Sequence, residues 1–133
     1  MLVLVDPNDS RAVRNKDMIL DHYARMINGK DAETGTRNFV DGYIQHNPLA
    51  ASGRAGVVKY FTEVRKVKPT PIPEKLKTPI VAVLAEGDLV IVAYPLKLAD
   101  PKNPSLKYTT TWFDMWRIKD GKADEHWDAA KRE

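Results

Sequence analysis

The chain contains 133 residues, a length that one domain fills and that is sufficient to bury a hydrophobic core. Hydrophobic residues make up 43% and charged residues 29%, as in ordinary globular proteins, and the formal net charge of +3 is a mild excess that gives little support to nucleic-acid binding. Cysteine is absent, which excludes disulfides, thiol nucleophiles and zinc–thiolate sites and agrees with the cytoplasmic location that we expect.

The first third of the chain is expected to be mainly helical. Its opening run, MLVLV, stops at Asp6-Pro7 and is too short for a signal peptide or a membrane span, so we expect no membrane partner. Apolar residues between positions 10 and 28 then recur at helical spacing, and Asn28-Gly29 predicts the end of this helix. A shorter helix is expected over residues 31–40, weakened by Gly35.

A short strand, a helix and a loop are predicted next. The segment GYIQHNP has the pattern of a strand, which Pro48 stops. The helix begins at Ser52 or Gly53, and its apolar stripe consists of Val57, Val58, Phe61 and Val64. The basic stretch RKVKPTPIPEKLK is broken by prolines, and we interpret it as a solvated loop rather than a nucleic-acid site.

The rest of the chain has the period of strands. The runs TPIVAVLA and LVIVAYPLKL meet at a hairpin signal, Glu86-Gly87-Asp88, and LKYTTTWFDMWRI turns at Asp120-Gly121 into ADEHWDA. Helices first and an antiparallel meander last favour an α+β fold, with helices on one face of a curved sheet, in a single domain over residues 1–133. Because both faces of IVAVLA and LVIVA are apolar, we expect a second copy of the chain to cover the outer face in a homodimer.

The last hairpin can be built in two registers. A two-residue turn at Asp120-Gly121 pairs Lys119 with Lys122, whereas a type I turn with Gly121 as the bulge residue pairs Ile118 with Lys122. The difference matters because a shift of one residue exchanges the two faces of a strand. We favour the bulged turn, since it separates a polar and aromatic face from a mainly apolar one.

The favoured register predicts which residues face a cavity. It places His126 beside Asp114 and Asp128 beside Trp112, whereas the other register places His126 beside Met115. In the favoured register one face carries Trp112, Asp114, Trp116, His126 and Asp128. The opposite face carries Phe113, Met115, Arg117 and Trp127.

The candidate catalytic residues are Asp114, His126 and Asp128. A carboxylate beside indole rings and away from bulk water has a raised pKa, which suits proton transfer at neutral pH. A nearby histidine can share the proton or polarise a carbonyl. The alternative is a buried hydrogen-bonded network that only fixes the hairpin. His46 in YIQHNP is a structural residue unless its strand borders the same cavity, and Tyr23 on the first helix is expected at the edge of the core.

We expect no metal and no cofactor. Histidine and aspartate are suitable metal ligands, but His126 and Asp128, two positions apart on a strand, do not form a specific ligand spacing. The sequence has no glycine-rich phosphate loop and no nucleophile elbow, so it gives no support to a nucleotide-binding or serine-hydrolase function.

Three phrases of the sequence together resemble the SnoaL-like polyketide cyclase family, within the nuclear transport factor 2-like superfamily. They are GYIQHNPLAASGRAGVVKYF, AVLAEGDLVIV and FDMWRIKDGKADEHWDAA, and the resemblance runs from about Asn15 to Ala129. It implies a cone-shaped fold with a deep pocket between helices and sheet, usually dimeric through the outer face of the sheet. The best-understood cyclases of the family close a polyketide ring by an intramolecular aldol condensation, without a metal or cofactor.

The resemblance also implies roles for particular residues. Asp128 in EHWD matches the family's acid/base, and Asp114 matches a polar pocket residue on the preceding strand. His46 and His126 match positions that line the family's pocket. Close relatives often carry a histidine in the strand after EGD, where this chain has Ala93-Tyr94, so we assign it no single relative's substrate.

The resulting hypothesis is a cofactor-independent acid/base enzyme, a SnoaL-like cyclase/lyase or isomerase, acting on a small to medium apolar carbonyl compound. Asp128 would abstract a proton next to the carbonyl, and His126 and Asp114 would tune Asp128 and hydrogen-bond the enolate oxygen. His46 would orient the substrate, and the pocket would be walled by Trp112, Trp116 and Tyr23. The alternative is a non-catalytic module of the same fold that binds a small hydrophobic ligand or serves dimerisation.

Overall fold

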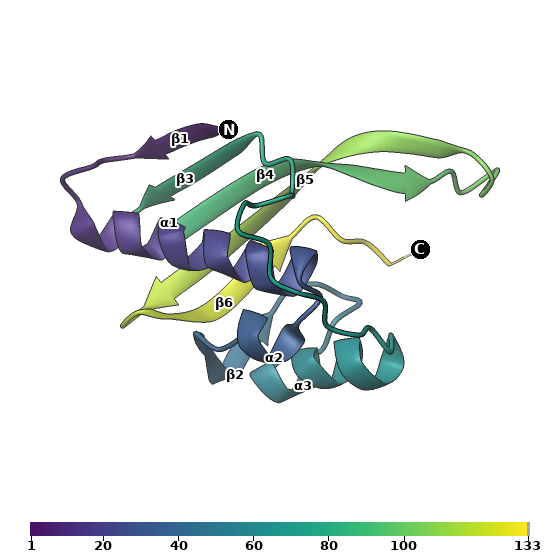
Figure 1. Ribbon diagram of the computed structural model, residues 1–133, viewed down its shortest axis with the longest axis horizontal. Helices are drawn as coiled ribbons and strands as arrows, with labels where there is room; N and C mark the ends of the chain where they lie inside the picture. Colours follow the sequence, from purple (N-terminus) through teal and green to yellow (C-terminus); the bar gives the residue numbers. More distant parts are fainter. Residues whose placement is uncertain (133) are drawn as a thin grey trace.

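Six strands form one mixed sheet in the order β1-β3-β4-β5-β6-β2 in the computed structural model, which describes residues 1–132 (Figure 1). The strands are β1 (Leu2–Val5), β2 (Phe39–Gln45), β3 (Ala82–Glu86), β4 (Leu89–Ala99), β5 (Lys107–Lys119) and β6 (Lys122–Asp128). The run from β3 to β6 is an antiparallel meander, and β1 and β2 pair in parallel with β3 and β6 at the two edges.

The helices cover one face of this sheet. They are α1 (Ser10–His22), which continues into a π-helical turn η1 (Tyr23–Asn28), α2 (Ala32–Gly35), and α3 (Arg54–Lys59), which continues into a second π-helical turn η2 (Tyr60–Val64). In Figure 1, α1 lies across the sheet, while α2 and α3 lie beside β2. None of the helices within residues 1–132 has the length and apolar composition needed to cross a membrane.

Local signals explain the placement of α1. The Asp9 side chain accepts hydrogen bonds from the backbone N–H groups of Arg11 and Ala12, which caps the first turn. At the far end, Gly35 of α2 packs so closely on Met26 of η1 that a methyl group at Gly35 would lie 2.9 Å from the Met26 Cβ. The glycine that weakens α2 as a helix is therefore what lets α2 approach η1.

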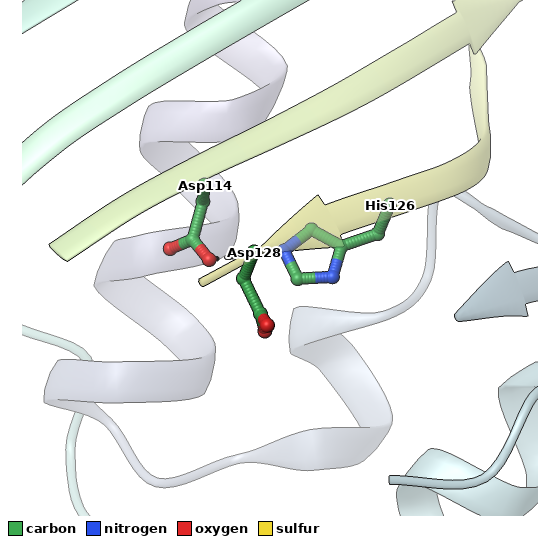
Figure 2. A group of neighbouring side chains, drawn as sticks. All are labelled: Asp114, His126 and Asp128. Carbon is green, nitrogen blue, oxygen red and sulfur yellow. Dashed lines mark hydrogen bonds and ion pairs between the residues drawn. The ribbon is translucent and has the colours of Figure 1, made fainter. Parts of the chain in front are cut away.

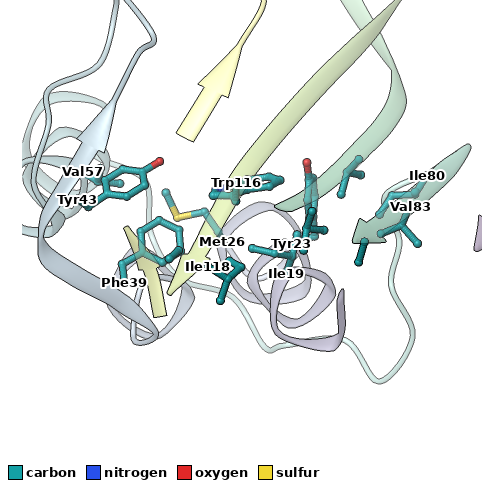
Figure 3. Close-up of a cluster of buried hydrophobic side chains, with 14 of the residues drawn as sticks. Ile19, Tyr23, Met26, Phe39, Tyr43, Val57, Ile80, Val83, Trp116 and Ile118 are labelled. Atoms are coloured by element: carbon teal, nitrogen blue, oxygen red, sulfur yellow. The ribbon is translucent and has the colours of Figure 1, made fainter. Parts of the chain in front are cut away.

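The hydrophobic core lies between α1 and the middle of the sheet (Figure 3). Ile19 and Tyr23 of the helical layer are completely buried, and so are three valines of the sheet, Val83, Val90 and Val92. These residues alternate along β3 and β4, so each strand gives one face to the core. The predicted α+β class and the predicted order of elements are confirmed, except that β1 was not expected as a strand.

The tip of the last hairpin has the unbulged turn. Asp120 and Gly121 have φ of +51° and +74°, and Lys119 pairs with Lys122. Positive φ at both central residues defines a type I′ turn. The twist of this turn matches that of the flanking strands, so it is favoured in two-residue hairpins. The favoured prediction, which pairs Ile118 with Lys122, is wrong.

Beyond the tip, one extra residue in β6 changes the pairing. Ile118 pairs with Ala123 but Arg117 pairs with Glu125, which leaves Asp124 as a bulge inside the strand. The pairs that follow are Trp116 with His126, Met115 with Trp127 and Asp114 with Asp128. The predicted pairings of His126 with Asp114 and of Asp128 with Trp112 are therefore wrong. The predicted pairing is shifted by two residues. Because side chains alternate with a period of two, each residue still faces the side that was predicted.

Candidate functional site

A cavity of about 850 Å³ lies between the helices and the end of the sheet where β6 stops. Its wall includes nine aromatic residues, Tyr23, Phe39, Tyr43, Tyr60, Phe61, Tyr94, Tyr108, Trp112 and Trp116. Asp114, His126 and Asp128 line it too, and Figure 2 shows their side chains converging from β5 and β6. A second cleft, of about 680 Å³, lies beside the start of α1 and the β5–β6 turn, and none of the expected site residues lines it.

Asp114 is buried and accepts hydrogen bonds from several side chains. The Tyr23 hydroxyl donates to Asp114 Oδ2 at 2.5 Å, and the Trp112 indole N–H donates to Oδ1 at 3.1 Å. His126 Nε2 lies 3.0 Å from the same Oδ1. Burial and the adjacent Asp114 charge together raise the pKa of Tyr23, so this phenol stays protonated and acts as the donor.

His126 is held from the other side of its ring by Gln45. His126 Nδ1 lies 2.6 Å from Gln45 Oε1, which also accepts the backbone N–H of Asn47 at 3.1 Å. That second bond identifies the Gln45 atom as the amide oxygen, an acceptor, so His126 Nδ1 must carry a hydrogen. Gln45 therefore fixes the orientation of the imidazole ring.

One proton consequently lies between His126 Nε2 and Asp114 Oδ1. With Nδ1 protonated, Nε2 either carries a second hydrogen or accepts one from the carboxyl group, because two bare acceptors do not form a 3.0 Å contact. In both cases a hydrogen bond joins the two side chains. Both residues are more than nine-tenths buried, which favours strong hydrogen bonds between them.

Asp128 has different partners. Its Oδ2 accepts the Asn47 side-chain N–H at 2.7 Å, and its Oδ1 accepts the backbone N–H of Ala130 at 2.9 Å. An ionised carboxylate has about four acceptor positions, so acceptor capacity remains for a ligand. Polar atoms of Asp114, His126 and Asp128 all lie within 4.8 Å of one another. Asp128 is thus an acceptor placed next to a proton-holding pair.

These three side chains could hold a metal ion by residue type and proximity. However, both oxygens of Asp114 and both ring nitrogens of His126 already take part in internal hydrogen bonds. A metal would have to displace the contacts that Tyr23 and Gln45 make. The donors present fit a hydrogen-bonded network better than a metal centre.

His46, expected to orient the substrate, lies outside the cavity. Its Nε2 contacts Glu125 Oε1 at 2.7 Å, and its ring stacks on Trp127 at a centroid distance of 5.0 Å. Strand alternation explains the error, because Tyr43 and Gln45 point inward and the next residue points outward. The other expected wall residues, Trp112, Trp116 and Tyr23, do line the cavity.

Several polar residues of the cavity were not predicted from the sequence. Gln45 and Asn47 flank the histidine of the YIQHNP phrase, and Tyr94 stands on β4 facing the same space. Burial raises the pKa of Tyr94, and the nearby Asp114 carboxylate raises it further. His22 donates from Nδ1 to the Gly35 carbonyl at 2.8 Å, and burial lowers its pKa, so its ring is neutral at pH 7. Only strand alternation across YIQHNP could have identified Gln45 in advance.

A model of the SnoaL-like domain family matches residues 6–126. No curated protein sequence matches the chain significantly.

Solved structures with the same architecture share little sequence with the chain. A protein of Xanthomonas campestris provisionally described as a polyketide cyclase has a TM-score of 0.66 at 14% identity, covering 92% of this chain and 93% of its own. TerC, co-crystallised with polyporic acid, has a TM-score of 0.64 at 18% identity, with coverages of 89% and 92%. A nuclear transport factor 2-like protein of unknown function from Burkholderia pseudomallei has a TM-score of 0.65 at 12% identity, with coverages of 89% and 91%. At these identities the likeness shows the fold alone.

Proposed function

The chain belongs to the SnoaL-like domain family, and on that premise we propose that it is a cofactor-independent acid/base enzyme acting on a small to medium apolar carbonyl compound. One observation carries the proposal. Asp128, which keeps acceptor capacity, lies within 4.8 Å of the His126–Asp114 pair in an aromatic cavity. A proton acceptor next to a held proton is what carbon-acid chemistry requires.

The first step is removal of a proton from the carbon next to the substrate carbonyl. Asp128 takes this proton, and the electrons of the C–H bond pass to the carbonyl oxygen to form an enolate. In an aldol closure the enolate carbon attacks a second carbonyl of the same molecule, and the new alkoxide takes the proton back from Asp128. The carboxylate is then regenerated and no external reactant is consumed.

Donors fixed before the reaction stabilise the enolate oxygen. His126 and Asp114 were expected to supply them, but their polar atoms are already engaged with each other, Gln45 and Tyr23. We assign the pair a role in positioning and in setting the field around Asp128. Tyr94 lines the cavity and its hydroxyl stays protonated because its pKa is raised, so we assign it as the donor to the enolate oxygen.

The alternative is a binding module that takes a small hydrophobic ligand without chemistry. It is favoured by the two hydrogen bonds to Asp128, which also serve to hold Asn47 and the backbone at Ala130 in place. Such a module needs the cavity but no titrating carboxylate.

Proton exchange distinguishes the two functions. The purified protein is incubated in deuterated water with a panel of apolar ketones and diketones, and deuterium at the carbon next to the carbonyl is followed by NMR. The proposal expects catalysed exchange with at least one class, retained after treatment with a chelator because no metal takes part. Binding without exchange across the panel supports the binding module. Activity that is lost on chelation and restored by a stoichiometric metal contradicts the metal-free mechanism.

We also propose that the protein is a homodimer and that it acts in the cytoplasm. The outer face of the sheet exposes Leu84 and Phe113, with half-buried Ile91, Met115 and Trp127 around them. Burial of such a face contributes about 25 cal/mol per Å² of apolar surface.

A further inference from the structure

Arg65 is an exposed cation on the cavity wall. It follows η2, lines the cavity, and its guanidinium carbon lies 5.9 Å from the centre of the Phe61 ring. Within residues 1–132 it takes part in no ion pair, whereas other arginines are paired with carboxylates, namely Arg11, Arg25, Arg37, Arg54 and Arg117. The contact with Phe61 holds the guanidinium against an aromatic surface and leaves its N–H groups available.

Outside the His126–Asp114 pair, cations outnumber carboxylates on the cavity lining by two to one. Arg65 and Lys131 are the cations, and Asp128 is the carboxylate outside the proton-holding pair. His22 is neutral at pH 7 because burial lowers its pKa. Both cations are exposed, so water solvates them in the free protein, and an anionic ligand can form an ion pair with them that a neutral ligand cannot.

We infer that the cavity takes a substrate with an aromatic or otherwise flat apolar body and one anionic group, a carboxylate, which Arg65 binds. This rests on the proposed function and names its substrate class. The planar guanidinium can donate two parallel hydrogen bonds to a carboxylate, and the aromatic wall packs on the body. Lys131, on the segment after β6, adds a second cation to the same wall. Asp128 then reacts at a carbon remote from the bound carboxylate.

Two small probes test this inference directly. The first is 2-naphthoate, an anion at pH 7.5, and the second is methyl 2-naphthoate, its uncharged ester. Binding to the full chain is measured by titration calorimetry or by quenching of tryptophan fluorescence. The naphthoate is expected to bind more tightly than the ester, and added salt is expected to weaken the binding of the naphthoate only.

Substitution of Arg65 tests whether this residue causes the preference for the naphthoate. Arg65→Gln should weaken naphthoate binding about tenfold, the scale of a charged hydrogen bond, and leave ester binding unchanged. Arg65→Lys should restore part of the loss, because it keeps the charge. Arg14→Gln is the matched control, since Arg14 is also unpaired within residues 1–132 but lines the other cleft, and it should change neither affinity.

Several outcomes overturn the inference. These are equal or tighter binding of the ester by the unmodified protein, an equal effect of Arg65→Gln on both probes, or no binding of either probe. Because none of these measurements involves turnover, the inference and the proposed function fail separately. Selective naphthoate binding without proton exchange on any carbonyl compound contradicts the enzyme and keeps the anion site. Proton exchange on neutral ketones without selective binding of the naphthoate supports the enzyme and contradicts the anion site.

Discussion

Asp114 and Asp128 stand directly opposite each other on β5 and β6, yet their carboxylates are held by entirely different donors. Asp114 contacts three side chains, whereas Asp128 has one amide and one backbone N–H. Two like charges in opposite positions destabilise a hairpin unless something compensates them. Here Tyr23, Trp112 and His126 surround Asp114 with hydrogen-bond partners, which leaves Asp128 as the carboxylate with acceptor capacity for a substrate proton.

Asp128→Asn should lower turnover by about 10²-fold or more, because it removes the proton acceptor and keeps the side-chain shape. Folding and ligand binding should stay close to those of the unmodified protein. The measurements are a melting curve and a proton-exchange assay, with the exposed Asp41→Asn as control. A folded variant with full exchange activity would exclude Asp128 as the base.

Tyr23→Phe should destabilise the fold by about 1–3 kcal/mol, because it leaves a buried Asp114 oxygen without its donor. Urea unfolding of this variant and of Tyr108→Phe gives the comparison. Tyr108 is 43% exposed, and losing its hydroxyl should cost nothing measurable. Equal stability of the two variants would show that the Tyr23–Asp114 contact does not contribute.

Protein stability should fall as the pH drops below about 6.5, the ordinary histidine value. Burial lowers the pKa of His22 in the folded state, so the unfolded chain binds a proton first as the pH decreases. The stabilising contribution is complete above the unfolded pKa and is lost between the unfolded and folded pKa values. Urea midpoints between pH 7.5 and 5 should therefore decline.

The dependence of stability on pH in a His22 variant tests whether His22 causes this decline. His22→Gln should be less stable at every pH, because the contact with Gly35 is weakened, but its decline with falling pH should be shallower. His46→Gln is the control, since the His46 side chain is 43% exposed. An unchanged slope in His22→Gln would assign the pH dependence to another group.

Sedimentation should find a dimer at tens of micromolar, and Phe113→Lys should convert it to a monomer. Phe113 is 53% exposed on the outer face of β5, where a lysine would bring a charge into the apolar contact. The matched control is Val64→Lys, because Val64 is equally apolar and 65% exposed but lies on η2, away from this face. A monomer in the unmodified protein would contradict the proposed assembly.

Gly121→Ala should cost about 1–2 kcal/mol of stability without changing activity, because an L residue is strained at a φ of +74°. An added Cβ would contact nothing within 4 Å, so the cost is purely conformational. Gly42 on β2 also has open space but no positive φ, and Gly42→Ala should stabilise by about 0.4–1 kcal/mol. Urea unfolding of the two variants should thus give shifts of opposite sign.

The order of elements could be predicted because each has a clear period and clear end signals. The helix over positions 10–28 has an apolar stripe of period 3.6, and the later strands are bounded by Gly87 and Gly121. β1 was missed because its residues Leu2, Val3 and Leu4 are all exposed and show no inside–outside alternation.

The candidate site was only partly predictable, because its contacts join distant parts of the chain. Tyr23 and Asp114 are 91 positions apart, and Gln45 and His126 are 81 apart, so no local pattern links them. The bulge at Asp124 has no glycine or other signal in the sequence. The cavity face of β6 was nevertheless predicted correctly, because a pairing error of two residues leaves the alternation unchanged.

The bulge at Asp124 has a consequence for how the chain can change length during evolution. Deletion of Asp124 would leave Arg117 opposite Glu125 and Asp114 opposite Asp128 on a regular ladder, so every cavity residue would keep its direction. Deletion of Trp127, three positions later, would instead turn Asp128 to the outer face. We therefore expect related chains to tolerate loss of the residue at Asp124, because only the curvature of the strand changes. A deletion nearer the end of β6 would instead remove the acid/base group from the cavity.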